Sequence, residues 1–259
     1  MYLNFITFFS IFSLLFIFFC RRNNFFVDYK LEKHKRFSSK FKSNSIGGIL
    51  LAIFFIYYYS LKQIDYIFLT FLISILVIGI MSDIKKLNNV GLRFFLQLIL
   101  IIFFIKILGL EIRTTKIDFI DTILSNTYVN ILFVTFCLMV LINGGNFIDG
   151  LNGLLLKYYL LIFVLIFLNF NHYQTIDENF LINLIFVLII LLLFNSFGFI
   201  YMGDAGAYVL SLFVGIYLID FSFDNTFISP YFVILLLGPL MPRAHGGLNS
   251  QRMQSSVSR

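Results

Sequence analysis

Long apolar runs with few charges follow one another through most of this chain, and they leave few folds open to it. A membrane span needs roughly 17–25 apolar residues, or fewer where a helix tilts or thins the bilayer. On this basis we expect nine transmembrane helices, near residues 4–20, 46–61, 66–82, 94–110, 129–145, 153–170, 180–199, 206–221 and 229–241. Hydrophobic residues make up 60% of the chain and charged residues 12%, with a mean hydropathy of +0.94. A soluble domain could not bury so much apolar surface.

The runs are continuous and do not alternate between apolar and polar residues, which favours helices over a transmembrane barrel. We therefore predict an all-α, polytopic integral membrane helix bundle. The first run has its arginines, Arg21 and Arg22, after the apolar residues, so we interpret it as a retained helix and not as a signal peptide.

Lys and Arg collect on the cytoplasmic side of membrane proteins, so the loop charges predict an orientation. With nine spans, fourteen of the 19 basic residues fall on one side, eight of them in the 21–45 loop, and four on the other. Lys157, near the start of the sixth run, belongs to neither group. The N-terminus is then outside and the first loop is cytoplasmic. An even number of spans remains the alternative.

Three short polar stretches with isolated acids follow the third, fifth and seventh runs: 81–84, 143–150 and 201–206. Parity places all three at one face of the membrane, the cytoplasmic face. A carboxylate there needs a cation or a donor as its partner, and Mg²⁺ is commonly held by one or two carboxylates plus substrate phosphates. Each stretch alone is also compatible with an ordinary turn.

These stretches carry a family resemblance. Segment 143–154, NGGNFIDGLNGL, resembles the N-x-x-N-x-x-D-G-x-D-G-L signature of the polyprenyl-phosphate N-acetylhexosamine-1-phosphate transferases, glycosyltransferase family 4. Segment 201–207, YMGDAGA, is similar to that family's F-M-G-D-x-G-S. Segment 79–87, GIMSDIKKL, with Arg93 and Gln97 after it, resembles its G-x-x-D-D block. The basic first loop also fits, and the likeness spans about residues 20–237.

The resemblance implies transfer of an N-acetylhexosamine 1-phosphate from a UDP-sugar to polyprenyl (undecaprenyl) phosphate, with release of UMP. Such a reaction starts cell-wall or surface-glycan synthesis at the cytoplasmic face of the inner membrane. The implied cofactor is Mg²⁺, with Mn²⁺ as a substitute, and the implied partners are the two substrates and membrane lipid. No nucleic acid is expected, and a homodimer is left open.

The resemblance also implies roles for individual residues. Asp204 is the first choice for the Mg²⁺ ligand, and Asp83 would assist the metal or orient the acceptor phosphate. Asp149, with Asn143 and Asn146, would shape the pocket for the nucleotide and its diphosphate. The three aspartates are the expected catalytic residues.

Three further residues are expected at the substrate. Asn152 would hydrogen-bond the uracil edge. Tyr201 stands where the family has Phe, and its ring either stacks on uracil or anchors the chain at the membrane interface. His34, in the basic first loop, either contacts a phosphate or is solvated, while most of that loop's Lys and Arg set topology and bind anionic lipid.

The chain also departs from the family pattern. Ser82 replaces the first acid of the Asp-Asp pair, Asn152 replaces an acid, and Ala207 replaces a hydroxyl residue. We assign 1–240 to the membrane transferase domain and 241–259 to a polar tail, either disordered or the product of a truncation or frameshift. The alternative function is an impaired relative, or a non-enzymatic multi-pass protein such as a transporter.

Overall fold

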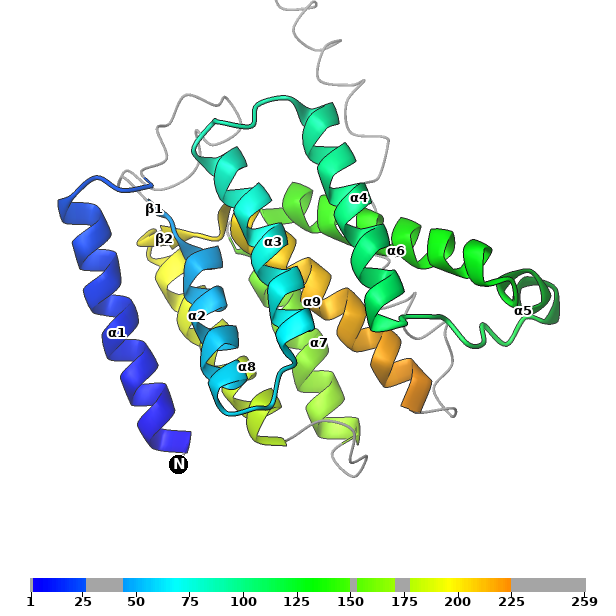
Figure 1. The fold of residues 1–259 in the computed structure, drawn as a ribbon. Helices are drawn as coiled ribbons and strands as arrows, with labels where there is room; N and C mark the ends of the chain where they lie inside the picture. Colours follow the sequence, from blue (N-terminus) through cyan, green and yellow to red (C-terminus); the bar gives the residue numbers. More distant parts are fainter. Residues whose placement is uncertain (1, 27–43, 150–152, 171–177, 225–259) are drawn as a thin grey trace, which may run out of the picture.

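The computed structural model describes residues 2–26, 44–149, 153–170 and 178–224. Helices make up most of this part of the chain (Figure 1). They are α1 (Tyr2–Arg22), α2 (Gly47–Ser60), α3 (Tyr66–Asp83), α4 (Val90–Leu108), α5 (Asp118–Leu124), α6 (Thr127–Asp149), α7 (Leu154–Phe170), α8 (Glu178–Ser196) and α9 (Gly203–Asp224). Two short strands, β1 (Asn44–Ser45) and β2 (Ile200–Tyr201), pair in parallel.

The prediction of an all-α membrane bundle is confirmed. Six of these helices, α1, α3, α4, α6, α8 and α9, are long and apolar enough to cross a membrane, and α2 and α7 are shorter apolar helices. Eight of the nine expected spans coincide with them. The ninth, 229–241, lies outside the described residues, as do the boundary at 240 and the polar tail. The short helix α5 was not predicted, because its seven residues are too few to give a hydrophobic period.

Helix α9 forms the centre of the bundle. About 83% of the residues in its apolar segment are buried, against 22% for α4 at the periphery. Helix α9 packs against α2, α3 and α6 (Figure 1). Small residues let these backbones approach. A Cβ on Gly145 of α6 would lie 2.0 Å from the Ser211 Oγ of α9, and one on Gly215 would lie 2.6 Å from a Leu138 methyl group. Close packing of this kind holds membrane helices together, since lipid provides no hydrophobic drive.

Helix α1 is fixed to the connection between α8 and α9. The Arg21 guanidinium donates to the carbonyl oxygens of Gly198 (3.1 Å) and Phe199 (3.3 Å) and lies 4.7 Å from the centre of the Phe199 ring. Directly after Phe199, β2 pairs with β1, with Ser45 opposite Tyr201. These contacts anchor the backbone that leads into the first turn of α9.

Candidate functional site at one end of the bundle

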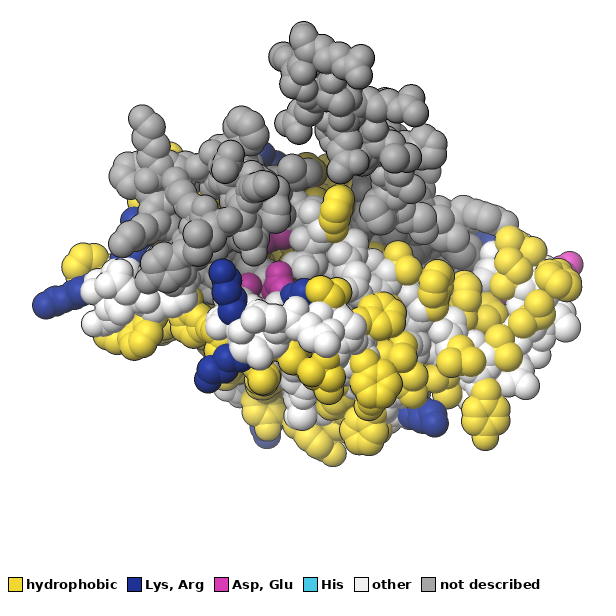
Figure 2. Space-filling model, turned by 90° about the horizontal axis from the view of Figure 1, so that it is seen from above, with side chains coloured by type: hydrophobic (Ala, Val, Ile, Leu, Met, Phe, Trp, Pro, Cys, Tyr) yellow, Lys and Arg dark blue, Asp and Glu magenta, His cyan; other side chains and the backbone are white. Residues whose placement is uncertain are grey.

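Three helix ends meet at one end of the bundle: the C-terminus of α3, the N-terminus of α4 and the N-terminus of α9 (Figure 1). Glycines make the approach possible. A Cβ on Gly79 of α3 would lie 2.3 Å from the Ala205 Cα, and one on Gly48 of α2 would lie 2.5 Å from the Gly206 nitrogen. The first turn of α9 is therefore held by backbone contact from α2 and α3. In the view of Figure 2, acidic side chains lie near the middle of this end with a basic side chain beside them, and apolar side chains lie along its lower and right edge.

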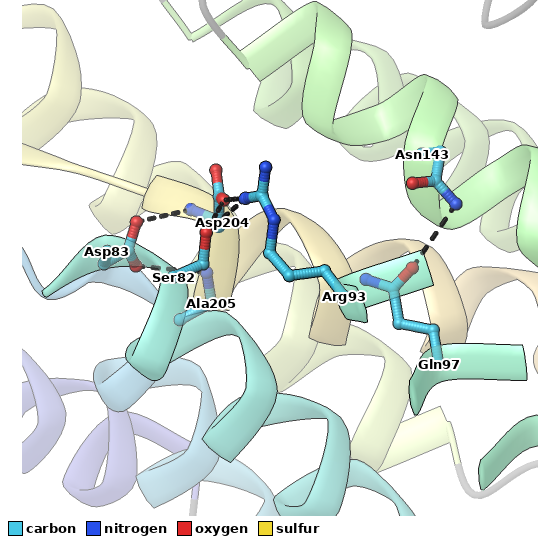
Figure 3. Close-up of polar contacts among 7 residues, drawn as sticks. All are labelled: Ser82, Asp83, Arg93, Gln97, Asn143, Asp204 and Ala205. Carbon is cyan, nitrogen blue, oxygen red and sulfur yellow. Dashed lines mark hydrogen bonds and ion pairs between the residues drawn. The ribbon is translucent and has the colours of Figure 1, made fainter. Parts of the chain in front are cut away.

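The Asp83 carboxylate caps the N-terminus of α9 from the neighbouring helix. Its Oδ1 accepts from the Asp204 backbone N–H at 2.9 Å and its Oδ2 from the Ala205 N–H at 3.1 Å (Figure 3). The first N–H groups of a helix have no acceptor within the helix, and a negative charge there is favoured by the helix dipole. Gly203 makes room for this contact. Its φ is +68°, and a Cβ would lie 2.7 Å from Asp83 Oδ2.

Asp204 has a second set of partners on its side chain. The Arg93 Nη1 of α4 donates to Asp204 Oδ2 at 2.6 Å. The Ser82 hydroxyl donates to the same oxygen and also accepts a hydrogen bond from Arg93 Nη1. Both charged side chains are partly exposed, 19% for Arg93 and 25% for Asp204. Figure 3 shows Asp83 and Arg93 approaching Asp204 from opposite sides.

The two carboxylates differ in what they offer a metal ion. Both Asp83 oxygens accept backbone N–H groups, whereas Asp204 Oδ1 has no hydrogen-bond donor among the contacts of the described residues and points away from Arg93 (Figure 3). No cluster of three or more His, Cys, Asp or Glu suited to a metal exists in the described part of the chain. The oxygen ligands present fit a hard cation that is held through one carboxylate oxygen together with substrate phosphates. They do not form a closed cage around the cation.

Three expected site residues lie on α6 at three-residue intervals, near one side of the helix: Asn143, Asn146 and Asp149. The Asn143 side chain donates to the Met139 carbonyl at 2.8 Å and to Gln97 Oε1 of α4 at 3.4 Å (Figure 3). Asp149 ends the helix and is within electrostatic reach of Asp83. The three acids thus lie at one end of the bundle, as expected.

The three polar stretches are not simple turns between the helices. The helices extend into them: Ser82 and Asp83 complete α3, residues 143–149 complete α6, and Asp204 lies in the first turn of α9. Two glycines in 143–149 suggested a turn, but Gly145 is there for close packing against Ser211.

Other expected site residues have different outcomes. Tyr201 lies half-buried in β2, two residues before Gly203, which is compatible with either of its proposed roles. His34 and Asn152 lie outside the described residues. Arg93 belongs to the family-like block and to the basic residues on the cytoplasmic side, and the resemblance implies no role for it at the site. Its contact with Asp204 joins residues 111 positions apart, so sequence alone carries no signal for it.

The fold and this end of the bundle define a polytopic helical membrane protein with an acidic and basic polar site at its helix termini. Residues 65–222 match the sequence model of the family described as Glycosyl transferase family 4, and the chain belongs to this family. It is therefore a membrane protein of transferase type. Comparisons with curated proteins and with solved structures returned no significant match.

Proposed function

We propose that this protein transfers an N-acetylhexosamine 1-phosphate from a UDP-sugar to polyprenyl phosphate, at the cytoplasmic face of the inner membrane. Family membership supports the sugar-phosphate transfer. The observation that carries the proposal for this chain is the meeting of Asp83, Arg93 and Asp204 at the end of an apolar bundle. A lipid acceptor can lie along such a bundle while its phosphate reaches polar groups at the membrane surface.

The proposed reaction exchanges one phosphoanhydride bond for another. A phosphate oxygen of the acceptor attacks the β-phosphorus of the UDP-sugar. The bond from that phosphorus to the oxygen bridging it to the α-phosphate breaks, and UMP leaves with this oxygen. Bound at Asp204 Oδ1, Mg²⁺ would offset the charge of the phosphates. No group on the protein needs to form a covalent intermediate.

The chain's own residues have separate tasks in this proposal. Asp83 holds the first turn of α9 and thereby sets the position of the Asp204 carboxylate. Arg93 contributes positive charge beside the phosphates. Asn143, Asn146 and Asp149 border the nucleotide side, with Asn152 and Tyr201 toward the uracil. An ion-relay transporter is less well supported, because the acids lie at helix ends and not in the middle of the spans.

The test is UMP release by the full-length protein in membranes or detergent, with polyprenyl phosphate and a panel of UDP-N-acetylhexosamines. We expect activity that chelation abolishes and Mg²⁺ or Mn²⁺ restores. Asp204→Asn should lower kcat/KM by about 100-fold or more. Asp65→Asn is the matched control, since Asp65 is an exposed acid at the start of α3 whose side chain makes no cap hydrogen bond. The absence of product with every sugar, or full activity of Asp204→Asn, would overturn the proposal.

A further inference from the structure

The Asp204 carboxylate is used unevenly. Oδ2 accepts from Arg93 Nη1 at 2.6 Å and from the Ser82 hydroxyl, while Oδ1 points away from both (Figure 3). Both Asp83 oxygens accept backbone N–H groups. Among the described residues, Arg93 is the cation that forms an ion pair with this acidic site, and it does so through Asp204. The charge of Asp204 is already neutralised before any metal ion binds.

Arg93 is held in this position incompletely. Its contacts to Ser82 and Asp204 both use Nη1, so the guanidinium does not form the two parallel bonds of a bidentate pair. Its Nε is buried and has no hydrogen-bond partner within the described residues. A buried donor without an acceptor is costly, so the present position of the Arg93 side chain is less stable than one in which Nε is also paired.

We propose that Arg93 is the exchangeable counter-ion of Asp204, which a divalent cation displaces when it binds at Oδ1. The inference rests on the proposed function in taking the cation site to be at Asp204. One carboxylate cannot neutralise a divalent cation and a guanidinium together, and two positive charges a few ångströms apart repel each other. The displaced guanidinium can then donate through Nε, which lacks an acceptor among the described residues. Arg93 is in this sense a positioning residue that lowers cation affinity in the absence of substrate.

The test measures Mn²⁺ affinity of the full-length protein in detergent, by electron paramagnetic resonance or calorimetry, without nucleotide or lipid. Arg93→Gln removes the competing charge and should bind Mn²⁺ about tenfold more tightly or better. Arg93→Met, which keeps an apolar stem, should do the same and serves if the glutamine variant does not fold. Arg93→Lys keeps the charge and should stay within about threefold of the wild-type affinity.

Lys86→Gln is the control for charge at a distance. Lys86 is an exposed cation in the same α3–α4 connection, and its loss should change Mn²⁺ affinity by less than about twofold. Unchanged or weaker Mn²⁺ binding in both neutral Arg93 variants would overturn the inference, as would an equal gain in Lys86→Gln. The outcome is independent of turnover. A gain in affinity in a protein that releases no UMP would support the counter-ion exchange and count against the proposed function alone.

Discussion

Replacing Gly203 with alanine should weaken the fold at the first turn of α9 through two separate effects. The first is the backbone: φ is +68°, and a left-handed conformation costs an L-residue about 1–2 kcal/mol. The second is steric, because the new Cβ would lie 2.7 Å from Asp83 Oδ2 and 2.9 Å from Oδ1. The carboxylate must shift, which weakens two charge-assisted hydrogen bonds that are each worth about 1.5–3 kcal/mol. We expect a total loss of about 3–5 kcal/mol of unfolding free energy.

Gly109 provides a matched control, because it isolates the backbone effect. Its φ is +62°, at the C-terminus of α4, and a Cβ there would meet nothing within 4 Å. Gly109→Ala should therefore cost only about 1–2 kcal/mol. The assay is reversible unfolding of the detergent-solubilised protein by SDS or heat. The difference between the two alanine variants measures the contact with Asp83.

A double-mutant cycle with Asp83→Ala assigns that difference to the carboxylate. Without the carboxylate the new Cβ has room, so Gly203→Ala in the Asp83→Ala background should cost no more than Gly109→Ala in the wild type. If Gly203→Ala costs the same with and without Asp83, or no more than Gly109→Ala in the wild type, the carboxylate is not the cap of α9.

Three further predictions concern other contacts. Gly145→Ala should destabilise the bundle by about 1–3 kcal/mol, because the new Cβ would lie 2.0 Å from Ser211 Oγ. Ser211→Ala should recover part of this loss in the double variant. Additive costs of the two substitutions in unfolding experiments would contradict the clash. Asn89→Ala removes the side-chain cap of α4 and should cost about 0.5–2 kcal/mol, with faster hydrogen exchange in the first turn, whereas Asn89→Asp should be nearly neutral. The hydroxyl of Thr114, with that of the neighbouring threonine, lowers the pKa of the Asp121 carboxyl. The Asp121 carboxylate therefore stabilises α5 above the unfolded-state pKa, and this stabilisation is lost as pH falls through the lower folded-state pKa. Thr114→Val should raise the Asp121 pKa in a carboxyl NMR titration, and an unchanged value would exclude the hydroxyl as the cause.

The helices of this protein could be predicted from sequence because lipid leaves the backbone so few choices. A run such as 66–82 must satisfy its own hydrogen bonds, and the observed α3 differs from it by one residue. The ends of the helices were harder to predict. Polar residues and glycines at 143–149 have the composition of a turn, yet α6 continues to Asp149. Composition does not reveal that Gly145 is there to admit Ser211 from another helix.

The site was predictable in location and not in its contacts. Parity placed Asp83, Asp149 and Asp204 at one end, because each follows an odd-numbered span. What each carboxylate touches depends on the approach of α3 and α4 to α9, over separations of more than 110 residues. The sequence therefore ranks Asp204 before Asp83 as a metal ligand only through the family resemblance, and it does not predict the contacts of either carboxylate. In the structure one caps a helix through both oxygens, and the other faces an arginine through one.

The same geometry explains how Ser82 is accommodated where the family-like pattern has an acid. A carboxylate at this position would lie beside Asp204 Oδ2 and would repel it, with Arg93 shared between the two charges. The Ser82 hydroxyl instead donates to Asp204 Oδ2 and accepts from Arg93, so it joins the pair without adding charge. One negative charge fewer weakens the attraction of the site for a divalent cation. At the proposed cation site, a cation would therefore rely more on the substrate phosphates than it would with an acid at position 82, and the ion pair between Arg93 and Asp204 would oppose its binding more strongly.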